Sequence, residues 1–213
     1  MIQYHREPGE VELIAASKSR SADEILALHR AGQTNFGENY LQEAQDKIKA
    51  LEEYSIEWHF IGAIQSRKAG LIAENFNWVH SVDRLKVANK LNRHATLDAP
   101  LNVLIQVNLE DESTKGGVAP DQLLELALEV DTLENLRLRG LMFMPKVHTL
   151  LADQRAVFKR AKDLFDNLKQ SLPEIDQISM GMSGDLEAAI AEGATMVRIG
   201  TALFGPREQK QSG

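Results

Sequence analysis

Cysteine is absent from this sequence, so neither a disulfide framework nor a thiolate zinc site can form. Long hydrophobic runs are absent too, because no apolar stretch approaches the roughly 18 residues of a membrane-spanning helix. The opening residues, MIQYHREPGE, lack the apolar centre of a signal peptide and carry acidic residues that transit peptides avoid. These absences predict a cytoplasmic protein with no membrane segment.

Positive charge is also limited. The chain has 24 lysines and arginines against 31 acidic residues, which gives a formal net charge of -7 at pH 7. A general affinity for nucleic acid or anionic membranes is therefore not expected, although a local basic pocket is compatible with this balance. The histidines show no metal-ligand spacing such as HExxH, so we predict no metal site; they stand at positions 5, 29, 59, 80, 94 and 148.

The remaining composition is that of an ordinary soluble globular protein. Of the 213 residues, 43% are hydrophobic and 26% are charged, which is enough to build a sizeable core. No linker-like or low-complexity stretch interrupts the chain. We therefore expect residues 1–213 to form a single domain.

Short apolar runs alternate with longer amphipathic segments along the whole chain. Leu41, Ala44 and Ile48, for example, repeat on one helical face, and Gly32 stands where an earlier helix would stop. The runs expected to form strands are 11–17, 34–37, 58–62, 77–82, 102–109, 136–144, 177–182 and 196–201. Strands alternating with helices in this number predict a single closed (β/α)8 TIM barrel. An open doubly wound sheet would fit the same alternation.

Lys18 follows the first of these runs, in the segment LIAASKSRS. A lysine is almost never fully buried without a partner, so its charge must reach solvent, a counter-ion or a reaction. Lys18 could simply open the next loop. In a barrel, however, the C-terminal ends of the strands carry the catalytic and binding residues, and Lys18 is expected at that end of the first strand.

Two segments near the end of the chain have the features of a phosphate site. Ser183 and Gly184 precede a helical pattern after the seventh strand, where unpaired N–H groups and the helix dipole favour an anion. Ser183 could instead cap that helix. Gly200 and Thr201 follow the apolar run of the eighth strand, and TIM barrels frequently bind phosphate after strands 7 and 8.

Arg198 lies within the eighth run, among small and aliphatic residues. Burying an arginine there is unfavourable unless the guanidinium faces a paired site or a cofactor. A nearby cation and partial burial would favour the neutral form of the Lys18 amine, which attacks carbonyl groups. Because a lysine beside a phosphate pocket suits a phosphorylated aldehyde, we expect Lys18 to hold pyridoxal phosphate (PLP) as an internal aldimine.

Several segments match, in order, the signatures of a known family: SKSRSADEI, FGENYLQEAQDKI, WHFIGAIQSRK, VNLEDESTKGGV, LRGLM, GMSGDLEAAI and MVRIGTALFGPR. From about residue 11 to residue 207 the sequence resembles the pyridoxal phosphate homeostasis proteins, the YggS/PROSC-like family. The resemblance implies a fold-type III barrel, similar to the N-terminal domain of alanine racemase, with PLP on Lys18. It also implies phosphate ligands at Ser183, Gly200 and Thr201.

The same resemblance places Arg198 against the pyridine nitrogen of PLP. An arginine there stays protonated and leaves the ring nitrogen unprotonated, which weakens the ring as an electron sink. Asn39 and His59 stand near the ends of the second and third strands and are expected to line the pocket. His59 could equally be an interior histidine whose hydrogen bonds are satisfied.

The function implied by the resemblance is a PLP carrier that takes part in intracellular PLP (vitamin B6) and amino-acid homeostasis, with little or no catalysis and no catalytic residue. The expected partners are apo forms of PLP-dependent enzymes, and the expected state is a monomer. The alternative is a fold-type III amino-acid racemase or decarboxylase. In the alanine racemases the second base is a tyrosine of an additional domain, whereas Tyr4, Tyr40 and Tyr54 lie in no appended domain.

The chain departs from the family pattern at a few positions. Ser21 stands where a proline commonly follows the lysine loop, and Ala63 and Arg67 replace a proline and an asparagine. Residues 111–117, DESTKGG, lack the GxxxxGK[ST] arrangement, so we expect a loop after the fifth strand that makes no phosphate contact. None of these departures falls on Lys18 or on the expected phosphate segments.

Overall fold

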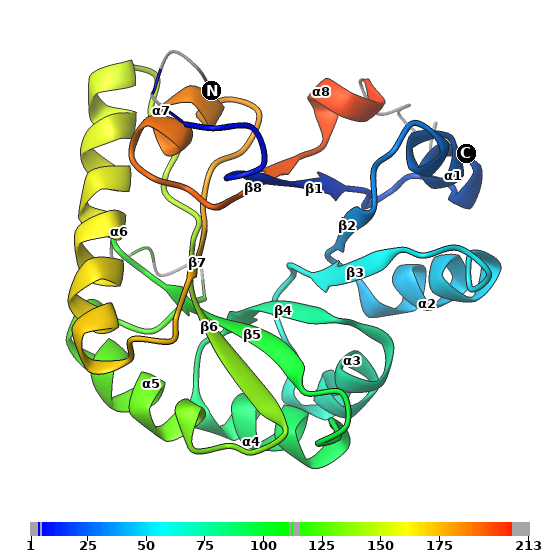
Figure 1. The fold of residues 1–213 in the computed structure, drawn as a ribbon, viewed down its shortest axis with the longest axis horizontal. Coiled ribbons are helices and arrows are strands. Elements are labelled where there is room, and N and C mark those ends of the chain that lie inside the picture. The colour runs from blue at the N-terminus through cyan, green and yellow to red at the C-terminus, as the bar shows by residue number, and fades with distance from the viewer. Residues whose placement is uncertain (1–3, 5, 111, 113–115, 206–213) are drawn as a thin grey trace.

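Parallel strands close into a barrel in this computed structural model, which describes residues 4, 6–110, 112 and 116–205 (Figure 1). Each strand pairs with its neighbours in sequence, and the last strand pairs with the first, which closes the sheet. The strands are β1 (Glu12–Ala16), β2 (Asn35–Glu38), β3 (Glu57–Phe60), β4 (Trp78–Val82), β5 (Leu101–Val107), β6 (Leu136–Phe143), β7 (Gln177–Ser179) and β8 (Met196–Ile199). The predicted (β/α)8 barrel is confirmed, and the open doubly wound sheet is wrong.

Helices alternate with the strands and cover the outside of the barrel (Figure 1). They are α1 (Ala22–Arg30), α2 (Leu41–Ala50), α3 (Ala69–Asn75), α4 (Leu85–His94), α5 (Leu123–Asp131), α6 (Leu151–Ser171), α7 (Leu186–Ala191) and α8 (Thr201–Phe204), with 3-10 turns η2 (Ser66–Lys68) and η3 (Pro120–Gln122). The described part of the chain contains no helix that combines the length and the apolar character needed to cross a membrane.

Local sequence signals set the ends of α1. Ser21 closes a capping box with Glu24: the Glu24 N–H donates to Ser21 Oγ at 3.2 Å, and the Ser21 N–H donates to Glu24 Oε2 at 2.7 Å. The serine that replaces the expected proline therefore has a structural role. Gly32 follows the helix with a φ of 102°, as its predicted stop position requires.

Several strands end one to three residues earlier than predicted, β7 and β8 among them. β7 stops at Ser179, although Met180 beyond it is fully buried, and β8 stops at Ile199, so Thr201 begins the short helix α8. Gly181 has a φ of 97°, which an extended strand does not adopt. The apolar run of β7 continues beyond the strand because Met180 and Gly181 are also buried, and a hydrophobic run reports burial rather than strand pairing.

The core has an outer and an inner part. The outer cluster lies between the barrel and its helices and includes Phe158 and Phe165 of α6. A separate cluster unites buried residues of β1, β4, β5, β6 and β8, so it lies inside the barrel; its members are Ile14, Trp78, Leu104, Met142 and Met196. This inner cluster fills the barrel below the strand ends, as is usual for a TIM barrel.

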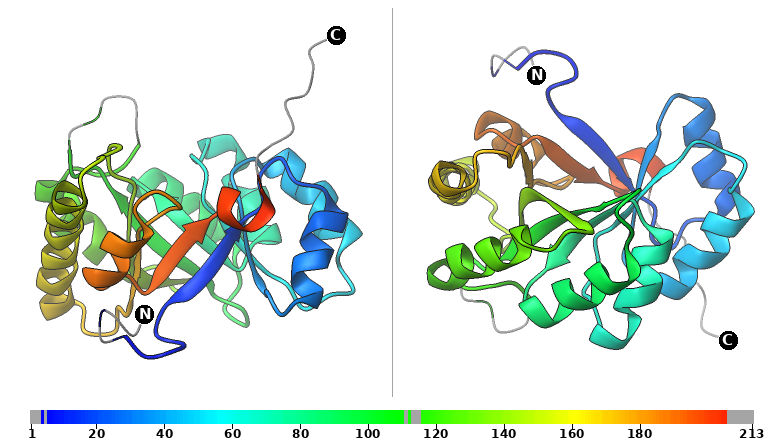
Figure 2. Two further views of the ribbon diagram at one scale, coloured as in Figure 1. Left: turned by 90° about the horizontal axis from the view of Figure 1, so that it is seen from above. Right: turned by 60° about the horizontal axis from the view of Figure 1, so that its bottom comes forward.

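The strand order brings the first and last segments of the chain together. β1 pairs with β8 on one side and with β2 on the other, and β7 pairs with β8. Figure 2 shows α8, in red, beyond the end of β8 and next to β1. The loops after β7, β8, β1 and β2 therefore share one side of the barrel mouth.

Candidate functional site

All the residues predicted to bind the cofactor lie at or near the C-terminal ends of these four neighbouring strands. They are Lys18 after β1, Asn39 after β2, Ser183 after β7, Arg198 within β8, and Gly200 and Thr201 after β8. A Cβ atom added to Gly200 would lie 3.3 Å from the carbonyl oxygen of Ala16, which shows how closely the ends of β8 and β1 approach. The structure thus groups positions that lie at opposite ends of the sequence.

Lys18 is half-buried in a turn directly after β1. The Ser17 N–H donates to the carbonyl of Gly37 at 2.9 Å, and the Arg20 N–H donates to the carbonyl of Ser17 at 3.0 Å. Ser19 has a φ of 62°, which makes it the one non-glycine residue with a positive φ in the part of the chain that the structure describes. Such a conformation costs about 1 to 2 kcal/mol and persists only where surrounding contacts hold it.

Those contacts come from Lys47 of α2, whose side chain is buried. Its Nζ donates to the Ser17 carbonyl at 2.8 Å, to Glu38 Oε1 at 2.7 Å and to Glu43 Oε1 at 2.6 Å. Glu43 Oε1 also accepts a hydrogen bond from the Ser19 N–H at 2.5 Å. The three donors of the Lys47 ammonium group are therefore engaged, and Lys47 and Glu43 together hold the residues on either side of Lys18.

Glu38 is the fully buried partner of this ammonium group. Burial raises the pKa of Glu38, and hydrogen bonds from Lys47 and Ser17 oppose that rise. The second oxygen of Glu38 and Oδ1 of Asn39 are buried and accept no hydrogen bond from the described residues. Because buried polar atoms are normally paired, Asn39 Oδ1 is an acceptor that a bound ligand could satisfy.

Arg20 connects the lysine turn to the segment after β8. Its Nη2 donates to the carbonyl of Gly205, and its guanidinium lies 5.4 Å from the centre of the Phe204 ring. Its Nη1 also pairs with Glu24 at 3.1 Å. The loop that carries Lys18 and the end of α8 are thus joined directly.

The loop after β7 leaves the Ser183 hydroxyl exposed and unbonded to other described residues. The interpretation of Ser183 as a helix cap is wrong, because α7 begins after Asp185 and has no side-chain cap. The Asp185 carboxylate instead accepts the Met182 N–H at 2.6 Å. A Cβ atom added to Gly184 would meet nothing within 4 Å, so this loop borders open space.

Arg198 is 6% exposed and lies in the interior at the end of the barrel. Its Nη1 donates to Ser179 Oγ at 2.6 Å, and its Nη2 donates to the carbonyl of Phe143 at 2.8 Å. Burial lowers the pKa of Arg198 to about 10, while Asp185 acts in the opposite direction, so the guanidinium is cationic at neutral pH. Of its five N–H groups, three have no acceptor among the described residues and can serve a ligand.

A buried polar chain continues from Arg198 through the barrel interior. His80 Nδ1 lies 3.0 Å from Ser179 Oγ, His80 Nε2 lies 2.9 Å from His59 Nδ1, and His59 Nε2 lies 3.2 Å from Asn35 Oδ1. His59 also stacks on Trp78 with ring centres 5.6 Å apart. His59 is therefore an interior histidine with satisfied hydrogen bonds, in a network that sequence reasoning did not find.

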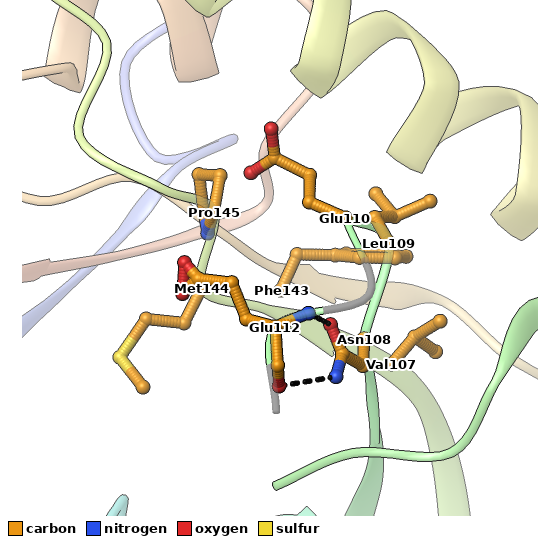
Figure 3. Close-up of a pocket in the computed structure, with 8 residues that line it drawn as sticks. All are labelled: Val107, Asn108, Leu109, Glu110, Glu112, Phe143, Met144 and Pro145. Carbon is orange, nitrogen blue, oxygen red and sulfur yellow. Dashed lines mark hydrogen bonds between the residues drawn. The ribbon is translucent and has the colours of Figure 1, made fainter. Parts of the chain in front are cut away.

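The opposite side of the mouth holds a small cavity between the ends of β5 and β6 (Figure 3). It has a volume of about 10 Å³ and is lined by Val107, Asn108, Leu109, Glu110, Glu112, Phe143, Met144 and Pro145. Glu110 accepts from the Lys146 N–H at 2.6 Å and pairs with His148 at 3.0 Å; burial would raise the pKa of Glu110, but these contacts lower it overall. None of the predicted cofactor ligands lines this cavity.

Two further segments were singled out in the sequence. Ala63 and Arg67, which depart from the family pattern, are exposed, and Arg67 contacts Gln65 at 3.3 Å. Most of the loop expected at residues 111–117 lies outside the described residues. No group of three or more acidic, histidine or cysteine side chains able to hold a metal occurs among the residues that are described.

Replacing Lys47 with Ala is predicted to lower the free energy of unfolding by about 3 to 5 kcal/mol, because Glu38 would be left as an unpaired buried carboxylate. Urea denaturation measures the change. Lys49→Ala, an exposed lysine of the same helix, is the matched control and should stay within about 0.5 kcal/mol of wild type. Equal, small losses in both variants would show that the buried contacts of Lys47 do not stabilise the fold.

Acid is predicted to destabilise the fold through the buried histidines. Burial lowers the pKa of His59 to about 3 and holds that of His80 well below its ordinary value. Between pH 6.5 and 3 the unfolded chain binds a proton at His59 that the folded chain does not, so stability falls as pH falls, by about 1.4 kcal/mol per pH unit. From pH 7 to 5, His59 alone accounts for about 2 kcal/mol.

The test compares the loss of stability between pH 7 and pH 5 in wild type and in His59→Gln. Wild type and His59→Gln contain the same carboxyl groups, so the difference between their losses of stability reports the effect of the histidine. His94→Gln removes a half-exposed histidine and should leave the loss unchanged. A wild-type loss that His59→Gln does not reduce would contradict the assignment.

Comparison with known proteins places this geometry in context. A family model for the alanine racemase N-terminal domain matches residues 2–208. The pyridoxal phosphate homeostasis protein of Haemophilus influenzae is 47% identical over 215 residues, which cover 99% of this chain and 91% of that protein. The protein of the same name from Pseudomonas aeruginosa is 52% identical over 204 residues, covering 95% and 87%.

Solved structures agree with the sequence comparison. The structure of PipY from Synechococcus elongatus with PLP bound matches with a TM-score of 0.87 and 37% identity, covering 94% of this chain and 95% of that one. The structure of PipY without PLP gives a TM-score of 0.89 at 38% identity, with the same two coverages. The chain therefore belongs to the alanine racemase N-terminal domain family, among the pyridoxal phosphate homeostasis proteins.

Proposed function

We propose that this protein binds PLP at the barrel mouth, holds it covalently through Lys18, and acts as a PLP carrier with little or no catalysis. The observation that carries the proposal is the convergence of a clamped lysine turn, two phosphate-receptive loops and a buried arginine on four adjacent strand ends. PLP would supply an aldehyde that reacts with a primary amine and a pyridine ring that can accept electrons. The names and the PLP-bound structure of the relatives support the same ligand.

The residues present fit this cofactor in its three chemical parts. Ser183 and Thr201 offer exposed hydroxyls beside Gly184 and Gly200, which suits a phosphate. Asn39 offers an unpaired buried oxygen within the same group of strand ends. Lys18 offers the amine, in a turn whose backbone is held on both sides by other residues.

Arg198 favours the carrier over the enzyme. As a cation whose three remaining N–H groups have no acceptor among the described residues, it would donate to the ring nitrogen of bound PLP and would leave that nitrogen without a proton. A ring nitrogen without a proton stabilises a carbanion poorly, and racemases and decarboxylases depend on that stabilisation. Tyr40 and Tyr54 are 61% and 36% exposed and lie on α2 or its flanks, so neither is built into the group of residues around Lys18.

The proposed role in the cell follows from two properties: PLP is held covalently, and it has little catalytic activity on this protein. A protein that binds PLP without consuming it can buffer the cofactor and pass it to apo forms of PLP-dependent enzymes in the cytoplasm. We propose that it does so as a monomer, which leaves the barrel mouth open to such partners.

Lys18→Ala is predicted to abolish the covalent adduct while leaving the fold intact, because Lys18 is only half-buried. Purified protein is incubated with PLP, its visible absorption is recorded, and the linkage is reduced with borohydride and mapped by mass spectrometry. Wild type and Lys86→Ala, an exposed lysine of α4, should carry the adduct on Lys18. Ser183→Ala should retain the adduct but lose about 1.5 to 3 kcal/mol of affinity, the scale of a hydrogen bond to a charged group.

An adduct on another lysine would overturn the role of Lys18, and wild-type protein that stays colourless would overturn PLP binding. Incubating the loaded protein with L-alanine or L-lysine separates carrier from enzyme. Chiral and amine analysis should show no racemised or decarboxylated product above the level given by free PLP. Product formation that Lys18→Ala eliminates would establish the alternative.

A further inference from the structure

We propose that Asn35, acting through His59, His80 and Ser179, fixes the orientation of the Arg198 guanidinium toward the barrel mouth. The four are positioning residues, and their role toward the cofactor rests on the proposed function. Asn35 begins β2, whereas Arg198 lies toward the end of β8, so the chain of contacts runs along the inside of the barrel. All its internal members, His59, His80 and Ser179, are fully buried.

The direction of the hydrogen bonds is set at the Asn35 end. The Asn35 Nδ2 faces Thr34 Oγ1 at 3.4 Å, and the Asn35 side chain also bonds Glu12, where it lowers the pKa of that carboxyl against the effect of burial. Both of these neighbours are acceptors, so the amide nitrogen faces them and Oδ1 faces His59. His59 must therefore carry its proton on Nε2.

The proton on His59 Nε2 determines where the other protons of this hydrogen-bonded series lie. With Nε2 protonated, His59 Nδ1 is an acceptor, so His80 donates to it from Nε2 across 2.9 Å. His80 Nδ1 is then an acceptor and receives the Ser179 hydroxyl proton across 3.0 Å. A second proton on His80 would sit on Nδ1 and displace the Ser179 hydroxyl proton from its acceptor, and burial already lowers the pKa of both histidines.

The consequence reaches Arg198. Because the Ser179 hydroxyl proton is committed to His80, only lone pairs of Ser179 Oγ face the guanidinium, which donates to it at 2.6 Å. The other fixed contact of Arg198 is also an acceptor, the Phe143 carbonyl at 2.8 Å. Two acceptors from two strands define the plane of the guanidinium, and a cation without acceptors of its own accommodates a neutral, unprotonated ring nitrogen.

The reversed chain would not do this. If His59 carried its proton on Nδ1, His80 would donate from Nδ1 to Ser179, and the serine hydroxyl would have to donate elsewhere. Ser179 Oγ would then accept from both His80 and Arg198, and its own hydroxyl proton would have no acceptor among the described residues. The charged groups near Asn35, where the series of hydrogen bonds begins, are Glu12, Glu57 and Arg139. Glu57 accepts the Trp78 indole N–H at 2.5 Å.

The test uses ¹⁵N-histidine NMR of the protein without added ligand and PLP titration of the same variants. The NMR signals of His59 and His80 are assigned by their disappearance in His59→Gln and His80→Gln. In wild type both histidines should be neutral, with the proton on Nε2. Asn35→Leu should lose this pattern and bind PLP about tenfold more weakly, since a buried N–H is left without its acceptor. The absorption maximum of its bound PLP should also shift, which a merely structural defect would not produce.

Asn102→Leu is the matched control. Asn102 stands at the same end of the barrel as Asn35, opposite Trp78 in the β4–β5 register, but it takes no part in the hydrogen bonds that link Asn35 to Arg198. It should keep the wild-type tautomers, and its PLP affinity should stay within about twofold of wild type. A proton on Nδ1 of either histidine in wild type overturns the inference even if Asn35→Leu fails to fold. So does Asn35→Leu with unchanged PLP affinity and absorption. Wild-type protein that binds no PLP overturns the proposed function instead. The histidine tautomers seen by NMR still test the hydrogen-bond directions in that case.

Discussion

A charge buried beside the open end of a closed barrel needs hydrogen-bond acceptors or counter-charges from the protein, and both halves of the candidate site are built on this constraint. A lysine or arginine removed from water loses several kcal/mol of hydration unless hydrogen bonds and counter-charges replace it. Lys47 meets the constraint with a carboxylate and a backbone carbonyl from the lysine turn. Arg198 meets it with a hydroxyl and a carbonyl from two other strands.

The two buried cations have different roles in the candidate site. Lys47 holds the Ser17 carbonyl, and Glu43, which Lys47 also bonds, holds the N–H of Ser19 in the left-handed region, so the backbone on either side of Lys18 is fixed. Arg198 presents a fixed positive donor where the resemblance expects the pyridine nitrogen. The exposed loops after β7 and β8 offer polar groups that suit a phosphate. The site therefore has a preorganised floor and a more open rim, which suits a protein that binds a cofactor and later releases it.

The fold and the first layer of the site could be predicted from the sequence because their signals are local. Apolar runs of strand length predicted every strand, and Lys18, Gly200 and Thr201 stand directly after such runs. Arg198 was found because an arginine among aliphatic residues needs a partner. Strand ends were less predictable, since Met180 is as buried as the strand residues before it.

The second layer could not be predicted, because its pairs join residues whose proximity depends on the barrel itself. Lys47 continues the buried face of α2, so one charged residue in an apolar stripe was the available signal, but nothing local identified Glu38 as its partner. His59 and His80 meet because β3 and β4 are neighbours, and His80 meets Ser179 across the barrel interior. Histidine spacing along the chain carries no trace of such a contact.

The most direct test of preorganisation is a pair of crystal structures, determined without PLP and with PLP bound. The account predicts that the backbone of residues 17–19 and the Arg198 guanidinium superpose within about 0.5 Å, the tolerance of a preformed site, with the guanidinium against the ring nitrogen. A guanidinium that leaves Ser179 or a lysine turn that rearranges on binding would contradict it.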